Sequence, residues 1–206
     1  MKALIVVDIQ NDFCQGGALE VPNANKIIPV VNNLIEKFKS RNFLVIATKD
    51  WHPKDHKSFA INSNGKIGEI GTLNGLPQVW WPEHCVQDTW GSELHKSLLP
   101  IDTVILKGTD PEIDSYSAFY DNGKKKKTNL GKILKKHDVS EVFIVGLATD
   151  YCVKYTVLDA LDIGFKTFVI EEGCQGVNLS PNDSDDALRE MVSKGASLLK
   201  YHEIKF

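Results

Sequence analysis

The sequence has no long hydrophobic run and no excess of charge of one sign. No apolar stretch approaches the roughly 20 residues that span a bilayer, and the first ten residues, MKALIVVDIQ, lack the long apolar region and cleavage site of a signal peptide. The net charge is -3, and the basic residues are dispersed apart from the run 124–127, which follows Asn122-Gly123 and is typical of a solvated loop tip. We therefore expect a soluble, cytoplasmic protein that binds neither membranes nor nucleic acid.

Cysteine is scarce, and internal repeats and low-complexity linkers are absent. The four cysteines, at 14, 85, 152 and 174, form no CxxC pair, so free thiols are expected rather than disulfides. A chain of 206 residues with 42% hydrophobic content can bury a sizeable core. The expectation is a single globular domain over residues 1–206.

Short apolar runs alternate with helical patterns along the chain. This alternation predicts an α/β fold of three layers, Rossmann-like, in which a six-stranded, mainly parallel sheet has helices on both faces. The segment 51–90 is long, weakly periodic and rich in Gly, Pro, Asn and Trp, and such a long loop usually has a function. The expected strands are 3–7, 43–48, 103–107, 142–145, 167–170 and 197–200, and the expected helices are 25–40, 92–98, 129–137, 150–163 and 184–194.

Chemically active side chains follow four of the predicted strands. Ligands of such sheets gather beyond the carboxyl ends of the strands, so these side chains are expected to converge on one rim. Each also has a purely structural explanation: the carboxylates could cap turns, the lysine could end its strand in solvent and the cysteine could be a small buried apolar residue. The four residues are Asp8, Asp50, Lys107 and Cys152.

Cys152 lies in the first turn of the predicted helix 150–163. The positive end of a helix dipole lowers a thiol pKa, and the free N–H groups there can hold an oxyanion. No histidine lies at a strand end near Cys152, so Asp8 is the candidate base, with Lys107 between the two. These three groups permit nucleophilic acyl transfer.

Three further side chains suit a catalytic divalent metal such as zinc, iron or manganese. Asp50 and His52 are two residues apart, on the same side of an extended backbone, and His84 comes from the long loop. Three ligands leave positions open for water or substrate. His56 is a candidate fourth ligand or a hydrogen-bonding neighbour of the ligands, whereas Glu83 and Cys85 point away from His84.

Five motifs follow one another along the chain: VDIQNDF at 7–13, KDWHP at 49–53, WPEHCV at 81–86, LKG at 106–108 and GLATDYCV at 146–153. Together they resemble the signatures of the nicotinamidase branch of the isochorismatase-like cysteine hydrolases, over about residues 1–200. The resemblance implies the same six-stranded fold. It also implies hydrolysis of nicotinamide to nicotinate and ammonia through a cysteine thioester, feeding NAD salvage, with pyrazinamide as an additional substrate.

The resemblance also implies a role for each matching residue. It implies one divalent ion, zinc before iron or manganese, which either orients the pyridine ring or supplies water. It further implies an oxyanion hole formed by the N–H groups of Ala148 and Cys152, next to a cis peptide at Leu147-Ala148. The implied sets are the triad Asp8, Lys107 and Cys152, the metal ligands Asp50, His52 and His84, the aromatic walls Phe13 and Trp81, and the pocket residues Leu19, Tyr116 and Tyr151.

Two alternatives remain at this stage. Relatives of the same fold hydrolyse carbamoyl or vinyl-ether substrates, but they generally lack the Asp50, His52 and His84 set. A zinc-stabilised or redox-sensing binding module is the second alternative, although a structural zinc site is closed by four protein ligands. The sequence leaves both a monomer and a homo-oligomer open.

Overall fold

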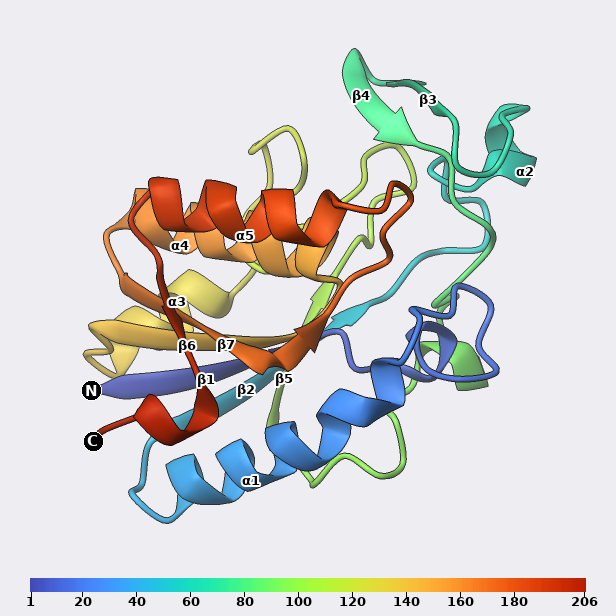
Figure 1. Ribbon diagram of the computed structural model, residues 1–206. Coiled ribbons are helices and arrows are strands. Elements are labelled where there is room, and N and C mark those ends of the chain that lie inside the picture. Colours follow the sequence, from blue (N-terminus) through green and yellow to red (C-terminus); the bar gives the residue numbers. More distant parts are fainter.

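The computed structural model describes all residues from 1 to 206 and is built around one six-stranded sheet (Figure 1). The strand order is β5-β2-β1-β6-β7-β8, and every pairing is parallel. The predicted α/β fold and its six strands are therefore confirmed. The strands are β1 (Lys2–Val7), β2 (Leu44–Asp50), β5 (Thr103–Lys107), β6 (Glu141–Leu147), β7 (Lys166–Gln175) and β8 (Ser197–Leu199).

Helices cover both faces of the sheet, as expected for parallel strands that are apolar on both sides. In Figure 1, α1 (Ile28–Lys39) lies below the sheet, and α4 (Lys154–Ile163) and α5 (Asp183–Ser193) lie above it. Leu4 and Val6 of β1 pack in the core between the sheet and α1, whereas Ile5 packs with α4, α5 and α3 (Leu130–Lys136). The side chains of the central strand β1 thus alternate between two hydrophobic cores, one on each face of the sheet.

Each of two predicted helices begins with a turn that is not α-helical. A 3₁₀ helix at Ala24–Ile27 precedes α1, and a π-helical turn at Thr149–Val153 precedes α4. The helix α4 ends at Gly164, whose φ of 99° suits a residue without a Cβ atom. The π-helical turn matters for function because it contains Cys152.

The prediction of a helix at 92–98 is wrong. Only a short 3₁₀ helix forms there, at Trp90–Ser92. The backbone that follows pairs with the segment after β1: Asn11 N–H donates to the Glu93 carbonyl, and His95 N–H donates to the Ile9 carbonyl. Because these groups find distant partners, a local helix cannot use them.

The long segment 51–90 contains a small hairpin that projects beyond the carboxyl ends of the sheet strands (Figure 1). It consists of β3 (Ile70–Leu73) and β4 (Leu76–Val79), which pair antiparallel, and it follows the short helix α2 (Ala60–Ser63). Asn74 and Gly75 turn the chain with φ values of 51° and 80°, as Asn-Gly does in tight hairpins. The segment 51–90, predicted to be a long loop, therefore contains regular structure in the form of this hairpin.

The remaining expectations concern cysteines, lysines and membranes. All four cysteines are free. The run 124–127 is exposed, and two of its members form ion pairs, Lys124 with Asp159 at 2.7 Å and Lys126 with Asp110. None of the helices combines the length and the apolar character needed to cross a membrane.

Candidate active site

The carboxyl ends of β1, β2 and β5 and the turn after β6 bring the four predicted rim residues together. Lys107 is at the centre: its Nζ lies 2.8 Å from Asp8 Oδ2, 2.6 Å from Asp50 Oδ1 and 3.4 Å from Cys152 Sγ. The same ammonium donates to the Ser115 carbonyl at 2.9 Å. Lys107 is buried, so it does not end its strand in solvent. A buried lysine contacting two carboxylates and a thiol is an unusual and costly arrangement, typical of a functional site.

Asp8 is held in place from two sides. Its Oδ1 accepts a hydrogen bond from Thr48 Oγ1 at 2.5 Å, and its Oδ2 faces Lys107. Burial raises the pKa of the Asp8 carboxyl above its ordinary value, and Lys107 only partly opposes this effect. A carboxyl with a raised pKa is a stronger base when ionised, which suits an acceptor of the thiol proton.

Cys152 lies in the π-helical turn, buried, with its sulfur directed toward the same centre. Burial raises the pKa of the Cys152 thiol well above its ordinary value, Lys107 lowers it, and the carboxylates of Asp8 and Asp50 raise it further. The prediction that the helix dipole lowers the pKa of the Cys152 thiol is therefore wrong. Burial beside two carboxylates outweighs the dipole, so the thiol has to lose its proton to a base during the reaction. The peptide Leu147-Ala148 is cis, as the resemblance implied.

Asp50, His52 and His84 form a buried set that fits a divalent metal. Asp50 Oδ2 lies 3.7 Å from His52 Nε2 and 4.0 Å from His84 Nε2, and these ligand atoms form a compact group. Each ring donates from Nδ1 to a backbone carbonyl at 2.8 Å, that of Gly108 for His52 and that of Pro82 for His84. These bonds orient both rings so that each Nε2 faces Asp50 Oδ2, where the three atoms could share one metal ion.

The surroundings keep the Asp50 carboxyl ionised and the His84 ring neutral, the forms in which each can coordinate a metal. Burial alone would raise the pKa of the Asp50 carboxyl, but Lys107 and the two histidines outweigh it and hold that pKa below its ordinary value. Burial, followed by the neighbouring His52, lowers the pKa of His84 to about 4, so this ring is neutral and able to coordinate. His56 is not in the set with Asp50; its ring centroid lies 4.3 Å from that of His52, and its Nδ1 bonds to Ser58 Oγ at 2.7 Å.

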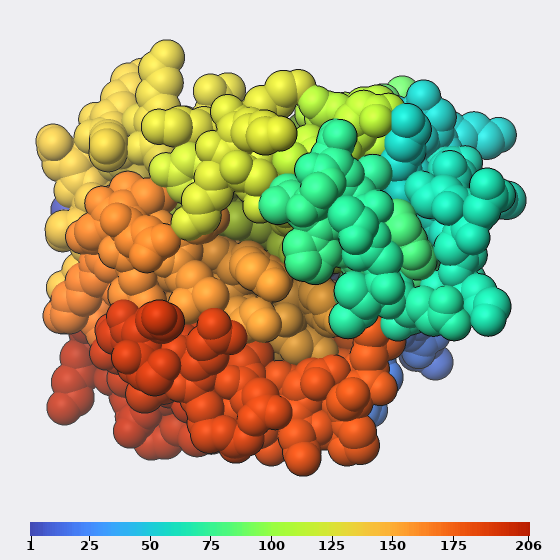
Figure 2. Space-filling model, turned by 90° about the horizontal axis from the view of Figure 1, so that it is seen from above, coloured from blue at the N-terminus to red at the C-terminus, as the bar shows by residue number.

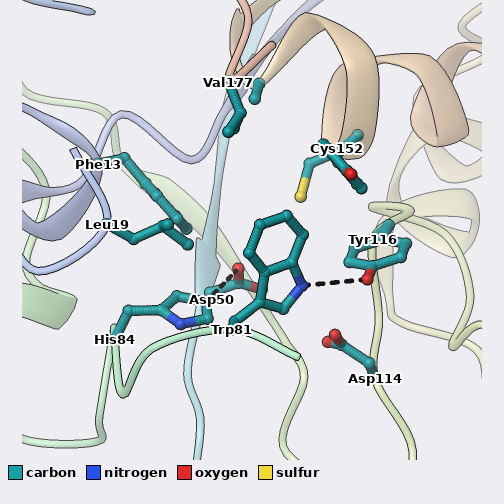
Figure 3. A pocket seen from close by; sticks show the side chains of 11 residues that line it. Phe13, Leu19, Asp50, Trp81, His84, Asp114, Tyr116, Cys152 and Val177 are labelled. Atoms are coloured by element: carbon teal, nitrogen blue, oxygen red, sulfur yellow. Dashed lines mark hydrogen bonds and ion pairs between the residues drawn. The ribbon is translucent and has the colours of Figure 1, made fainter. Parts of the chain in front are cut away.

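A pocket opens beside both groups and is shown in Figure 3. Phe13 and Leu19 lie on one side of it, Trp81 stands in the middle, and the Cys152 sulfur points toward the indole. All the predicted pocket residues line it: Phe13, Leu19, Trp81, Tyr116 and Tyr151, together with Asp50, His84, Ala148 and Cys152. The same pocket is thus lined by the thiol and by two of the candidate metal ligands, Asp50 and His84.

Comparison with known proteins places the chain in a family. The family profile of the isochorismatase domain matches residues 2–203. The chain belongs to the isochorismatase family. The nicotinamidase of Escherichia coli (strain K12) is 51% identical over 199 residues, which cover 96% of this chain and 93% of that protein.

Solved structures of the isochorismatase family agree in fold. A nicotinamidase pyrazinamidease of Acinetobacter baumanii has a TM-score of 0.92 and 41% identity, covering 98% of this chain and 97% of that one. The pyrazinamidase of Pyrococcus horikoshii in complex with zinc has a TM-score of 0.81 and 42% identity, covering 97% of this chain and 98% of that one.

Two pocket residues of this isochorismatase-family chain were not predicted, Asp114 and Val177. Asp114 is a buried carboxylate, and its Oδ2 accepts a hydrogen bond from Gln78 Nε2 at 2.9 Å. Neither residue belongs to a motif or closely follows a predicted strand; Val177 comes two residues after β7, which continues to Gln175, beyond the predicted end at 170. Their contribution to the pocket depends on loops that fold back from far along the chain.

Proposed function

We propose that this chain is a nicotinamidase, which hydrolyses nicotinamide to nicotinate and ammonia and deamidates pyrazinamide in the same way. The observation that carries this proposal is the contact of a thiol, a carboxylate and a buried ammonium beside a metal-ligand set, all at one aromatic pocket. The names of the similar proteins support it. We also propose that residues 1–206 form a single domain.

Asp8, Lys107 and Cys152 would carry out the acylation. Asp8 takes the proton of the Cys152 thiol, and Lys107, in contact with both, stabilises the charge as it moves from carboxylate to sulfur. The thiolate attacks the carboxamide carbon, a C–S bond forms, and the carbonyl electrons move onto oxygen. The backbone N–H groups of Ala148 and Cys152 are assigned to hold that oxyanion.

Asp8 then acts as an acid. Its carboxyl gives the proton to the amide nitrogen, the C–N bond breaks, and ammonia leaves a thioester on Cys152. A water molecule that loses one proton to Asp8 attacks the thioester carbon, so that a C–O bond forms and the C–S bond breaks. The Asp8 proton returns to the sulfur, and the product acid loses the remaining proton of the water to solvent as nicotinate. One carboxylate thus serves in both halves of the reaction, and no histidine is needed as a base.

Asp50, His52 and His84 would hold the metal ion, which we propose to be zinc. A divalent ion bound there supplies a coordination position for the pyridine nitrogen of the substrate. His56 would then support the ring of His52 rather than coordinate. Phe13 and Trp81 would sandwich the pyridine ring, with Leu19, Tyr116 and Tyr151 completing the wall.

The test is ammonia release from nicotinamide, pyrazinamide, an N-carbamoyl amine and, by product detection, isochorismate, each with and without a chelator. Efficient turnover of nicotinamide and pyrazinamide that requires metal is expected, together with loss of activity in Cys152→Ala. Preference for the carbamoyl or vinyl-ether substrate would refute the assignment. Appreciable ammonia release by Cys152→Ala would refute the nucleophile.

A further inference from the structure

Gln78 is a buried amide on a hairpin whose other side is exposed. Its exposed fraction is 3%, whereas Ile70, which faces the partner strand position at Val79, is 75% exposed. The two hydrogens of the Gln78 Nε2 group are shared among three acceptors, the Val79 carbonyl at 2.8 Å, Asp114 Oδ2 at 2.9 Å and the Tyr116 hydroxyl at 3.2 Å. Two of these acceptors line the substrate pocket, yet the proposed mechanism gives Gln78 no task.

The contacts of Gln78 continue to the indole of Trp81. Trp81 Nε1 donates to the Tyr116 hydroxyl oxygen at 3.1 Å, drawn as a dashed line in Figure 3. Donors from Gln78 and Trp81 therefore converge on one phenol oxygen, which has two lone pairs to accept them. The three side chains form a short relay from the hairpin to the wall of the pocket.

The backbone of Trp81 is fixed independently of this relay. Its N–H donates to the Ser58 carbonyl and its carbonyl accepts from Ala60 N–H, both at 2.9 Å. What these bonds leave free is rotation of the side chain. The bond to Tyr116 is the hydrogen bond of the indole, and it acts together with packing against Tyr151, whose ring centroid is 4.9 Å away, to orient the indole plane.

The hairpin is tied to the loop that carries Asp114, because Asn74 Nδ2 donates to the Glu112 carbonyl at 2.7 Å. Trp80 lies against the backbones of Gly65 and Gly71, so closely that a Cβ atom on Gly71 would come within 2.4 Å of the indole. Figure 2 shows this part of the chain, in blue-green, beside α4 at the hollow face of the molecule. Gln78 thus contacts two residues of the pocket wall, Asp114 and Tyr116, from a hairpin that is itself bonded to the loop after β5.

We propose that Gln78 is a positioning residue for substrate binding. Its amide holds Tyr116 and Asp114, and Tyr116 in turn holds the indole of Trp81 in the plane against which the substrate ring packs. The inference rests on the proposed function, because it assigns the pyridine ring to Trp81. Ring packing is the same before and during the reaction of the carboxamide, so loss of Gln78 raises KM and leaves kcat nearly unchanged.

The kinetic test compares Gln78→Leu, which keeps the approximate size but removes the donors, with Ile70→Ala on the exposed side of the same hairpin. For Gln78→Leu, KM for nicotinamide is expected to rise about tenfold while kcat changes less than threefold, as the loss of hydrogen bonds to a carboxylate and a phenol implies. Ile70→Ala is expected to keep both constants. The metal content of the wild-type protein, Gln78→Leu and Ile70→Ala is also measured. Equal values would show that the change in KM does not come from a displaced Asp114 that disturbs the metal ligands.

The spectroscopic test follows the Trp81 Nε1–H resonance, identified by its loss in Trp81→Phe. It is expected to shift in Gln78→Leu and to stay in place in Ile70→Ala. An unchanged resonance, an unchanged KM, or a loss confined to kcat would each overturn the proposal. Should Gln78→Leu fail to fold, Tyr116→Phe breaks the same relay at its centre and must show the same shift and the same rise in KM.

The two proposals fail in different ways. If the wild-type protein and Ile70→Ala release no ammonia from nicotinamide, the proposed function is wrong, while the resonance still reports whether Gln78 orients Trp81. If the wild-type protein, Ile70→Ala and Gln78→Leu are all active and have the same KM, only the positioning role of Gln78 is refuted.

Discussion

The Lys107 ammonium lies 2.6 Å from Asp50 Oδ1, while Oδ2 of the same carboxylate faces the two histidines at 3.7 and 4.0 Å. Asp50 therefore belongs to both halves of the site. One oxygen holds the lysine that contacts Asp8 and Cys152, and the other is directed to the proposed metal. Loss of this carboxylate should disturb both the chemistry and the metal site.

Asp50→Asn is therefore expected to lose more activity than His84→Ala when zinc is supplied in excess. Both variants weaken the metal site, but only Asp50→Asn also removes a charged partner of Lys107, a difference of about tenfold in kcat/KM. The measurement is turnover of nicotinamide at several zinc concentrations, with bound metal determined alongside. Equal residual activity at equal occupancy would show that the Lys107 contact has no catalytic consequence.

Lys107→Met tests the contribution of the buried ammonium to stability. It leaves Asp8 and Asp50 side by side in the interior with no cation, and breaking a buried ion pair in this way costs about 3–5 kcal/mol. The matched control is Lys57→Ala, because Lys57 pairs with Glu112 at 2.7 Å where both side chains are about half exposed, and such pairs contribute less than about 1 kcal/mol.

Urea denaturation of the two lysine variants and the wild-type protein, all in the presence of a chelator, gives the comparison without a contribution from metal. A Lys107→Met protein as stable as Lys57→Ala would mean that the two carboxylates are protonated in the folded state and need no counter-ion.

The sequence predicts the sheet well because its strands contain short apolar runs, several of which end at or next to a polar residue. Asp8, Asp50 and Lys107 follow or end three such runs, and parallel strands place their ends on one rim. The same argument located Cys152 but not its pKa. A thiol pKa depends on burial and on carboxylates from other strands, which the local helix position does not reveal.

The misses have a common origin in contacts between distant segments. The backbone expected to form a helix at 92–98 instead bonds to the segment after β1, more than 80 residues earlier in the chain. Gln78 stands in a short strand without apolar periodicity, and its burial comes from Asp114, 36 residues later. Periodicity reports only local preference, so neither partner could be identified from the neighbouring residues.

The buried Cys14 thiol should make the protein less stable in alkali. Burial, and then the charge of Glu20, raises the pKa of Cys14 to about 11 from the ordinary 9.0. A raised pKa in the folded state means that the contribution is complete below pH 9 and is lost as pH rises toward 11, because the unfolded thiol ionises first. The loss is about 2 kcal/mol over this interval.

Cys14→Ser, whose hydroxyl does not ionise in this range, provides the comparison. The unfolding free energy of the wild-type protein minus that of Cys14→Ser is expected to fall from pH 8 to pH 11, whatever its sign and value at pH 8. Lysine titration affects both proteins alike and cancels in the difference. A difference that is constant with pH would show that the Cys14 thiol ionises as easily in the folded protein as in the unfolded one.

Zinc should stabilise the folded protein through Asp50, His52 and His84, because these ligands are brought together only on folding. At a free zinc concentration about 100 times Kd, binding adds about 2.7 kcal/mol, which corresponds to a rise in Tm of about 5–10 °C for a chain of this size. His84→Ala is expected to lose most of that rise. His137→Ala removes an exposed histidine far from the ligand set in sequence and should retain it. The readout is thermal unfolding with zinc and with chelator, and a rise in Tm that survives in His84→Ala would place the stabilising zinc elsewhere on the protein.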